Sequence, residues 1–576
     1  MPNGRPWRQP PNGFSLLLII LLAANYFAPF GDLDFAWQIR TAERIVETGE
    51  FRPLEAFTYT IASSQETEFE WLYEIVLWAI WKALGFGGLK LLKTILVVTP
   101  LLLLSLRLRR EEVHWYGIVL AILTAIVVLS PAWNLRPLYC TTIGLLLVSG
   151  WLHDHCTGRR PLTCWLLPAM FLWSNLHPAV IVGQGLLAGA IGWEWLNRWL
   201  KWNPPLDRSA NWRLTWIGGL GLAVTFFSPH PLDRLLFPFR PELAHPIQRI
   251  FVEMQPLYLF LFRPPYTAVL AYLVAVLVGL TVVLCFRHYR LWEVMLLLGL
   301  ALLANMAVRS LQDWLLVMLA LGVPHVGLLL KALQVRIRDG KRQQANLAFG
   351  SAGWWVAGDG WRAKHLLTSH PLRTTFRPPP STLIALCVLH GLLRADRFCK
   401  RLLSSRLFRW QWFWPATVCA LLTVVSLIPP LGRRMPVQES SDWPARAVDF
   451  IQAEGLEGRF FTVPDFGSYL TWRLGERTKC YVCSRSFSFP PELLEDSHLV
   501  PQLTPDWRLR MDRILDYGTD YFLLETWGPR GRLWHSLEAH IAEPLYRDDR
   551  TVLLSAAQMR AALNAMEDGT LGVAAR

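Results

Sequence analysis

Long apolar runs with few charges recur along most of the chain, separated by polar connections. Most runs have roughly the length that a helix needs to cross the hydrocarbon core of a bilayer. The pattern therefore predicts a mostly α, polytopic membrane protein with about 11 transmembrane helices. The expected spans lie near residues 13–30, 88–106, 115–131, 137–152, 162–176, 178–200, 214–229, 266–286, 291–308, 311–330 and 412–430.

Residues 69–84 form another apolar segment, which carries several Trp side chains. A full span there would invert the side of the membrane on which every later connection lies. Because Trp prefers the headgroup region of a bilayer, we expect this segment to be an amphipathic helix lying in the interface.

The chain from residue 432 to 576 has a different pattern, in which short strand-like runs alternate with helical ones. Residues 444–456 and 506–517 have helical periodicity. The strand-like runs lie at 459–463, 479–483, 521–525 and 551–554. This alternation is typical of layered α/β folds, so we expect a small C-terminal soluble α/β domain over residues 432–576.

Composition supports the membrane interpretation. Hydrophobic residues make up 53% of the chain and charged residues only 18%, and there are 29 Trp. A soluble protein of this composition would expose large apolar patches and aggregate, which excludes a soluble cytosolic enzyme. Nine Cys in 576 residues are fewer than a disulfide-rich secreted scaffold needs.

The formal net charge of +13 is unevenly distributed along the chain. Residues 331–411 contain 15 Lys or Arg against three Asp, which leaves +12 in that segment. A basic stretch beside membrane spans is typical of a cytoplasmic face and suits anionic lipid headgroups. We therefore expect a basic cytoplasmic connection over 331–411, and no binding of nucleic acid.

The same rule orients the chain. With the N-terminus in the cytoplasm, the basic connections near residues 107–110 and 287–290 lie inside, and the first loop, 31–87, lies outside. We expect a multi-pass protein of the inner (plasma) membrane, with the C-terminal domain extracytoplasmic. A cleaved signal peptide is the alternative for the first run, but no clear small-x-small cleavage site precedes Gly31.

Two acidic residues open the first outer loop, directly after the first span. Asp32 and Asp34 stand in the phrase Gly31-Asp32-Leu33-Asp34. Carboxylates at a membrane surface are costly unless they are solvated, paired or used in chemistry. A carboxylate here can deprotonate an acceptor hydroxyl or hold a divalent cation. The alternative is that Asp32 caps the helix that follows.

Other polar residues stand at the outer ends of predicted spans, among them Arg136, His177 and Arg309. An Arg at such a place can bind a phosphate through two parallel hydrogen bonds. Each residue also has a plain structural interpretation: Arg309, for example, can pair with Asp313 four residues later. Their shared placement on one side of the membrane favours a common functional site.

The outer loop also resembles a motif of certain bacterial membrane glycosyltransferases. Many of those proteins carry Asp-x-Asp-x-x-Trp-His, then Pro-x-x-Asp-Pro-Phe-Ser-Tyr-Thr, then Glu-Trp-Leu. The matching phrases here are Asp32-Leu-Asp34-Phe-Ala-Trp37-Gln38, Pro53-Leu-Glu55-Ala-Phe57-Thr-Tyr59-Thr60 and Glu70-Trp71-Leu72, and similar landmarks are Arg136-Pro137 and Trp173-Ser-Asn175-Leu-His177.

On these motifs, residues 14–330 resemble the GT-C superfamily of membrane glycosyltransferases. The closer resemblance is to bacterial proteins related to protein O-mannosyltransferases and lipopolysaccharide galacturonosyltransferases. In the tail, residues 467–470 and 481–485 are similar to a Gly-Gly-Tyr-Leu phrase and an Asp-x-Arg phrase. The departures are Gln38 in place of His, Glu55-Ala in place of Asp-Pro, and Cys483 in place of the Asp of Asp-x-Arg.

The resemblance implies a GT-C-like transmembrane core over residues 13–330, with a last span at 412–430. It implies a polyprenyl-phosphate-linked sugar donor lying between the spans and a glycan, lipid or protein acceptor entering from outside. The expected reaction is a single displacement with inversion at the anomeric carbon. Asp34 would be the general base, with Asp32 as second choice, and Arg136, Arg309 and His177 would bind the donor phosphate.

Glu70 and Glu74 would position the acceptor or a metal, or else anchor the interfacial helix. A divalent cation stays open as a cofactor, because Asp-x-Asp can bind Mg²⁺ or Mn²⁺ and GT-C members are divided on metal. Two other functions stay open. One is a catalytically silent GT-C-like scaffold that presents its outer domain. The other is a transporter or flippase, which predicts charges near the bilayer midplane rather than at span ends.

Overall fold

The structure is a computed structural model, in which residues 12–27, 33–51, 55–62, 69–130, 133–236, 251–263, 267–329, 443–485 and 488–574 are described. Three predicted features lie outside these residues. They are Asp32, the basic connection over 331–411 and the last span at 412–430.

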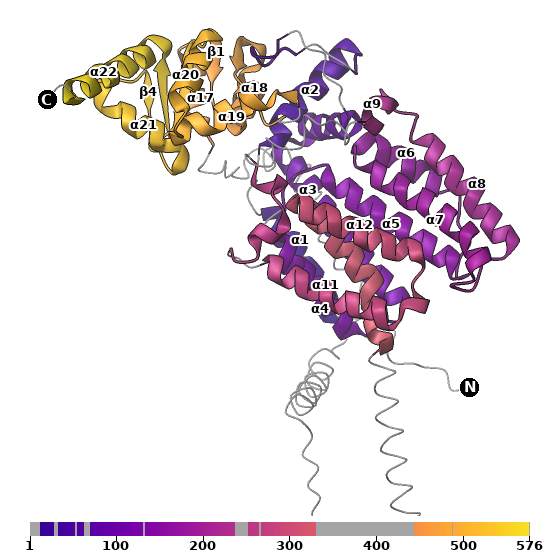
Figure 1. The fold of residues 1–576 in the computed structure, drawn as a ribbon. Coiled ribbons are helices and arrows are strands. Elements are labelled where there is room, and N and C mark those ends of the chain that lie inside the picture. Colours follow the sequence, from indigo (N-terminus) through magenta and orange to yellow (C-terminus); the bar gives the residue numbers. More distant parts are fainter. Residues whose placement is uncertain are drawn as a thin grey trace, which may run out of the picture.

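A helix occupies the position of each of the first ten predicted spans, and together these helices form a bundle (Figure 1). The helices are α1 (Asn12–Phe27), α3 (Trp71–Arg110), α4 (Trp115–Leu129), α5 (Leu138–Cys156), α6 (Leu166–Leu176), α7 (Val180–Leu200), α8 (Arg208–Val224), α11 (Thr267–Leu284), α12 (Leu291–Met306) and Val308–Leu329. Buried apolar side chains of α3 to α8, α11, α12 and Val308–Leu329 form one continuous core.

Among the described residues, three helices are long and apolar enough to cross a membrane, namely Trp71–Arg110, Thr267–Leu284 and Val308–Leu329. The count of 11 spans therefore stays a prediction. Several helix ends differ from the predicted span ends; α8, for example, begins at Arg208, before the expected start of the span at 214. The reason is that Asp207 caps it, and the Asp207 side chain accepts a hydrogen bond from the Ala210 N–H at 2.6 Å.

The segment over residues 69–84 is the first part of α3, which bends at Gly85. Gly85 has φ 61° and ψ −150°, a conformation that glycine adopts without strain, and it divides α3 into two helical parts. The break falls where the sequence analysis separated an interfacial helix from the next span. A second apolar cluster includes Phe35, Leu77 and Trp472. Trp78, Trp81 and Phe86 pack against it.

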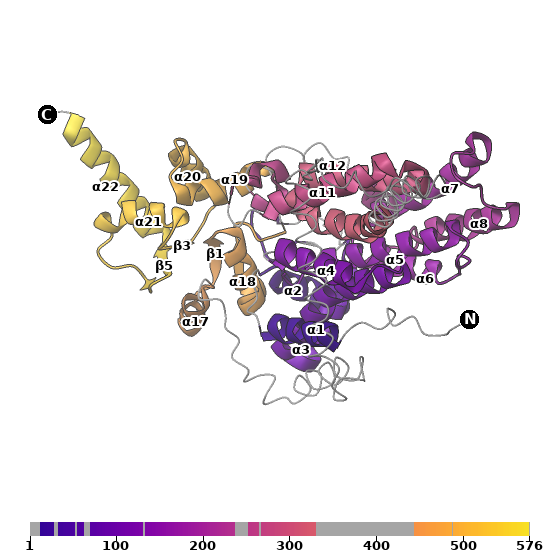
Figure 2. The same cartoon turned by 90° about the horizontal axis from the view of Figure 1, so that it is seen from below.

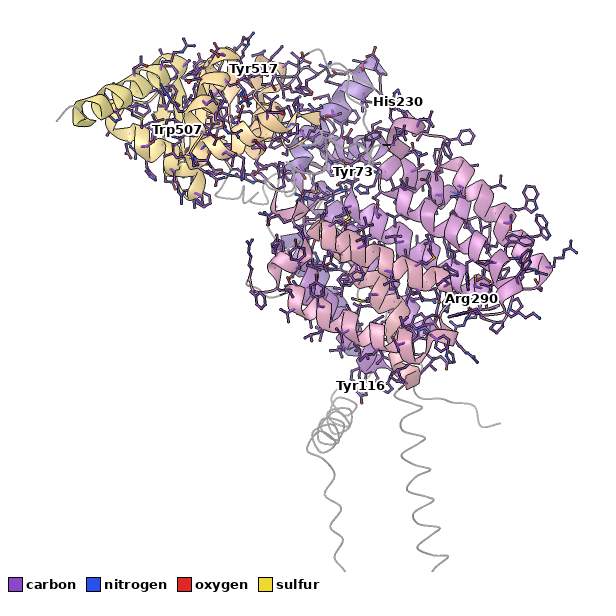
Figure 3. The ribbon with its side chains drawn as sticks, in the orientation of Figure 1. Tyr73, Tyr116, His230, Arg290, Trp507 and Tyr517 are labelled. Carbon is purple, nitrogen blue, oxygen red and sulfur yellow. The ribbon has the colours of Figure 1, made fainter. Side chains whose placement is uncertain are left out.

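The two ends of the bundle carry different connections. Tyr73 and His230 lie at the end that faces the C-terminal unit, and Arg290 and Tyr116 lie toward the other end (Figure 3). His230 belongs to a connection expected outside, whereas Arg290 belongs to one expected inside. The bundle therefore separates these two classes of connection in space.

The C-terminal unit is an α/β layer built on a five-stranded sheet of order β2-β1-β3-β5-β4. β1 pairs in parallel with β2 and β3, while β5 is antiparallel to β3 and β4. The strands are β1 (Gly458–Phe461), β2 (Thr478–Cys480), β3 (Tyr521–Glu525), β4 (Tyr546–Arg547) and β5 (Thr551–Ser555). All four predicted strands occur, and the sequence missed only the two-residue β4, which is too short to show a periodicity.

Helices of the unit are α17 (Ala445–Ala453), α18 (Pro464–Leu474), α19 (Pro491–Leu499), α20 (Trp507–Asp516), α21 (Arg532–Leu537) and α22 (Ala556–Ala574). Two of them, α18 and α19, begin with Pro, whose fixed φ suits the first helical turn. In both cartoon views α18 lies beside α2 (Asp34–Thr48), the first helix of the outer loop (Figures 1 and 2).

The contact between α18 and α2 is apolar and belongs to a second cluster of buried side chains, distinct from the core of the bundle. The ring centroids of Phe35 on α2 and Trp472 on α18 are 5.6 Å apart, and both rings pack close to Phe86 of α3. The Arg40 side chain adds a hydrogen bond to the Trp472 carbonyl at 3.0 Å. The C-terminal unit therefore holds the helix that begins with Asp34.

Candidate active site

The predicted site residues come from connections and helix ends at the end of the bundle that faces the C-terminal unit. Asp34 is the first residue of α2, Glu70 precedes α3, and Arg136 shortly precedes α5. His177 lies between α6 and α7, and Arg309 lies in η7 (Val308–Ser310). Inside the bundle, helices satisfy the hydrogen bonds of the buried backbone. Helix ends leave backbone groups open, and polar side chains are therefore found there.

Asp34 stands where the positive end of the α2 dipole favours a carboxylate. Leu33 occupies the N-cap position of α2, and the capping alternative for Asp32 stays a prediction because Asp32 lies outside the described residues. The Asp34 side chain is 24% exposed, and its Oδ2 lies 3.3 Å from Nη2 of Arg136. Nη1 of Arg136 donates to Glu253 in η4 (Val252–Met254). Arg136 thus bridges two partly exposed carboxylates.

His177 is buried, and both of its ring nitrogens have neighbours. Nδ1 lies 2.7 Å from the hydroxyl of Thr141, and Nε2 lies 3.5 Å from Oε1 of Glu70. Burial, together with the nearby guanidinium groups of Arg309 and Arg234, lowers the pKa of His177 to about 3. His177 is therefore neutral at physiological pH and can offer a hydrogen bond but no positive charge.

Glu70 connects the outer loop to the bundle. Its Oε2 accepts a hydrogen bond from Nε2 of Gln38 at 3.4 Å, on α2, while its Oε1 faces His177. Gln38 stands at the position of the His in the motif that the first loop resembles, and here its amide serves as a donor to Glu70. Next in the chain, Trp71 donates from its ring N–H to Asn175 at 3.0 Å. Two motif phrases, Glu70-Trp71 and Asn175-Leu-His177, are thus in direct contact.

Arg234 is the site residue that sequence reasoning missed. It lies on α9 (Pro231–Leu236), is only 4% exposed, and donates from Nη2 to the Phe69 carbonyl at 3.2 Å. Its Nε and Nη1 are buried and find no hydrogen-bond partner among the described residues. Burial lowers the pKa of Arg234 to about 10, with Glu70 opposing the shift, so the side chain stays charged at neutral pH.

The other predicted residues divide between the site and the interior. Arg309 lies 3.7 Å through Nη1 from the Met254 sulfur, and its charge acts on His177. Asp313, the expected partner of Arg309, accepts a hydrogen bond from Thr142 at 2.5 Å. Glu74 lies one turn after Glu70 on α3 and is fully buried. The structure therefore brings Glu70 but not the Glu74 carboxylate to the exposed part of the site.

A metal centre does not emerge from the geometry of the described part of the chain. Within those ranges, no group of three or more His, Cys, Asp and Glu side chains is placed to hold an ion. The second carboxylate of Asp-x-Asp, Asp32, lies outside the described residues. Binding of a divalent cation by the Asp-x-Asp motif therefore stays a prediction.

Neither a protein-family model nor a curated protein matches the chain. Among solved structures, the chain is similar to ArnT from Cupriavidus metallidurans bound to undecaprenyl phosphate, with 16% identity and a TM-score of 0.47. It is also similar to the same ArnT in the apo state, with 15% identity and a TM-score of 0.46. Each match covers 94% of this chain and 98% of that chain. Likeness at this level is distant and specifies neither donor nor acceptor.

Proposed function

We propose that this protein is an inverting glycosyltransferase of the inner membrane, which moves a sugar from a polyprenyl-phosphate donor to an acceptor outside. Its first support is the resemblance of the outer-loop motifs to GT-C enzymes. The observation that carries it is Arg234, a buried guanidinium with two donor nitrogens that have no partner among the described residues. A buried cation with open donors is costly unless an anion binds it, and phosphate fits its fork geometry.

A second guanidinium and an imidazole lie near Arg234, as a phosphate site requires. The charges of Arg309 and Arg234 both act on His177, so the two guanidinium groups lie near the same neutral imidazole. In this proposal Arg234 and Arg309 stabilise the negative charge that grows on the departing polyprenyl phosphate. His177 is neutral and both of its ring nitrogens have neighbours in the protein, so in this proposal it supports the site without supplying a charge.

Asp34 is the proposed general base. It is partly exposed and oriented by Arg136, which in turn is held by Glu253. Asp34 accepts the proton of the acceptor hydroxyl while that oxygen bonds to the anomeric carbon and the bond from that carbon to the phosphate oxygen breaks. Attack on the face opposite the leaving phosphate inverts the anomeric configuration. Arg136, predicted to bind phosphate, is proposed instead to orient the base.

The proposal includes the topology expected from charge, with the N-terminus cytoplasmic and the C-terminal unit outside. The acceptor is a glycan, a lipid or a protein, and the partly exposed carboxylates of Asp34 and Glu253 would border its entrance. Glu70, which is held by its contacts with Gln38 and His177, would position the acceptor. Undecaprenyl phosphate, the lipid bound to one ArnT structure, is a suitable first probe of the donor site.

The test is a transfer assay with purified protein in nanodiscs, polyprenyl-phosphate sugars and envelope fractions as acceptors, following the release of free polyprenyl phosphate. Asp34→Asn should lower the rate by about 10²–10⁴-fold, because it removes the base but keeps the shape. Asp207→Asn is the matched control. It changes a carboxylate at the cap of α8, where Asn caps equally well, and should leave the rate unchanged.

Two results would refute the proposal. Full activity of folded Asp34→Asn would remove Asp34 from the base role. No release with any polyprenyl-phosphate sugar, in a protein that folds and inserts normally, would favour the silent scaffold instead.

A further inference from the structure

A buried ion pair joins the outer loop to the C-terminal unit. Arg485 donates from Nη2 to Oε2 of Glu55, and the two side chains are 7% and 1% exposed. The other carboxylate oxygen of Glu55 accepts the backbone N–H groups of Phe57 and Thr58 at 2.6 and 2.8 Å. Burial raises the pKa of Glu55, but Arg485 and these two N–H groups outweigh burial, so the pKa is lowered and Glu55 is ionised.

The loop beside Glu55 extends the sheet of the C-terminal unit. Thr58 forms a parallel bridge with Cys480 at the end of β2. The Cys480 N–H donates to the Phe57 carbonyl at 2.9 Å, and the Tyr59 N–H donates to the Cys480 carbonyl at 3.3 Å. The Thr60 hydroxyl also donates to the Tyr481 carbonyl. A segment of the first loop therefore covers the β2 edge, which satisfies backbone groups that an edge strand leaves open.

Arg485 also reaches the helix that carries Asp34. Its guanidinium carbon lies 5.7 Å from the ring centroid of Trp37, within cation–π range, and Trp37 is one helical turn after Asp34. Glu55 fixes one side of the guanidinium, and Trp37 lies against its face. The same side chain thus connects the outer loop, the C-terminal unit and the start of α2.

The backbone that presents Arg485 is itself held tightly. The Ser484 N–H donates to the Ser468 hydroxyl of α18 at 3.0 Å. A Cβ at Gly467 would overlap the Val482 carbonyl oxygen, so the close approach of α18 to this segment requires glycine. In this chain Gly467 lets α18 approach the segment over 481–485, and that segment places Arg485.

We infer that Arg485 is a positioning residue, which sets the orientation of α2 and thereby of Asp34 through Trp37, using Glu55 as its anchor. The inference rests on the proposed function of Asp34. In this inference the C-terminal unit contributes to the reaction by helping to orient Asp34, the proposed base. Arg485 touches neither donor nor acceptor in this account, so its loss should change turnover rather than the binding of the donor.

The test compares wild-type protein with the double variant Glu55→Gln/Arg485→Met in nanodiscs. Removing one partner of a buried pair leaves an uncompensated charge, whereas removing both is often close to neutral for stability. The double variant should therefore melt near the wild-type temperature. Its kcat should fall by roughly tenfold to a hundredfold because a small displacement of the base is enough, while KM for the donor stays unchanged.

Hydrogen exchange supplies a readout that does not need activity. The double variant should exchange faster than wild type in peptides covering residues 34–48 and 55–60. Arg473→Met is the matched control, because Arg473 also pairs with a carboxylate, Asp449, and lies over an aromatic ring, Tyr469, but within the C-terminal unit. It should change neither exchange in those peptides nor kcat. If the double variant does not fold, Arg485→Lys keeps the charge, loses the planar fork, and should show a smaller change of the same kind.

The outcomes separate this inference from the proposed function. A wild-type kcat in the folded double variant, or unchanged exchange over 34–48, would overturn the positioning role. If wild-type protein transfers no sugar at all, the proposed function fails, and the exchange data alone then decide whether Arg485 orients α2.

Discussion

Two clusters of charged residues lie at opposite ends of the bundle, and they are built differently. At the end away from the C-terminal unit, Arg107 lies 2.9 Å from Asp154, Arg290 lies 2.6 Å from Glu194, and His153 lies 2.5 Å from Glu293. At the other end, Arg234 is just as buried, but two of its donor nitrogens have no partner among the described residues.

The difference separates a structural use of charge from a chemical one. In the first cluster each buried Arg is matched by a carboxylate on another helix, so the network ties α3 to α5 and α7 to α12. In the second, the positive charge of Arg234 is held ready beside a neutral His177. In the first cluster, Nε of Arg107 and Oε1 of Glu194 also lack a hydrogen-bond partner among the described residues, but Arg234 has two such donors on one side chain, and we propose that the second cluster binds a ligand.

The largest expected effect concerns the structural cluster. Arg290→Met should lower the free energy of unfolding by about 3–5 kcal/mol, because it leaves the Glu194 carboxyl group in the interior without its ion-pair partner. Thermal melting in detergent checks this. Polyprenyl phosphate should still bind the fraction that folds. The double variant Glu194→Leu/Arg290→Met should recover most of the lost stability, and a melting temperature unchanged by Arg290→Met would contradict the structural assignment.

The opposite pattern is expected for Arg234→Met. Removal of a buried and incompletely hydrogen-bonded cation should leave the melting temperature unchanged or raise it. The affinity for undecaprenyl phosphate should fall by about tenfold to a hundredfold, which corresponds to a loss of 1.5–3 kcal/mol for a hydrogen bond to a charged group. Microscale thermophoresis or native mass spectrometry measures the affinity. Strong destabilisation with unchanged affinity would place Arg234 among the structural residues.

A smaller effect tests whether His177 is neutral. Its pKa is lowered from 6.5 to about 3, so between these pH values the unfolded chain binds a proton that the folded protein does not. The free energy of unfolding should therefore fall as the pH decreases from 6.5, by about 2 kcal/mol at pH 5. His177→Gln should remove this part of the pH dependence. His535→Gln, at an exposed position, is the control and should leave it as in wild type.

Much of the architecture could be predicted because hydrophobic patterning acts locally. A helix occurs at each of the first ten predicted positions, and the four predicted strands occur in one sheet. Boundaries were harder, since caps such as Asp207 extend a helix beyond its apolar run. The expected boundary between residues 69–84 and the next span is Gly85, whose non-helical backbone divides α3 into two helical parts.

Prediction of the site was limited by long-range contacts. The motif phrases indicated Asp34, Arg136, His177 and Glu70, and the structure brings these side chains toward one end of the bundle. Arg234 was missed because, in the sequence, it is one charge in a Pro-rich connection beside Asp233. Only burial and the missing hydrogen bonds distinguish it. The pairing of Glu55 with Arg485, 430 residues apart, likewise has no local signal.

The most direct test of the central claim is a cryo-electron microscopy structure of the protein in nanodiscs with undecaprenyl phosphate. The account predicts a phosphate within hydrogen-bonding distance of Arg234 and Arg309, with Asp34 facing the same outward opening. A phosphate bound elsewhere, or Nε and Nη1 of Arg234 fully paired with the protein while the lipid is absent, would contradict it.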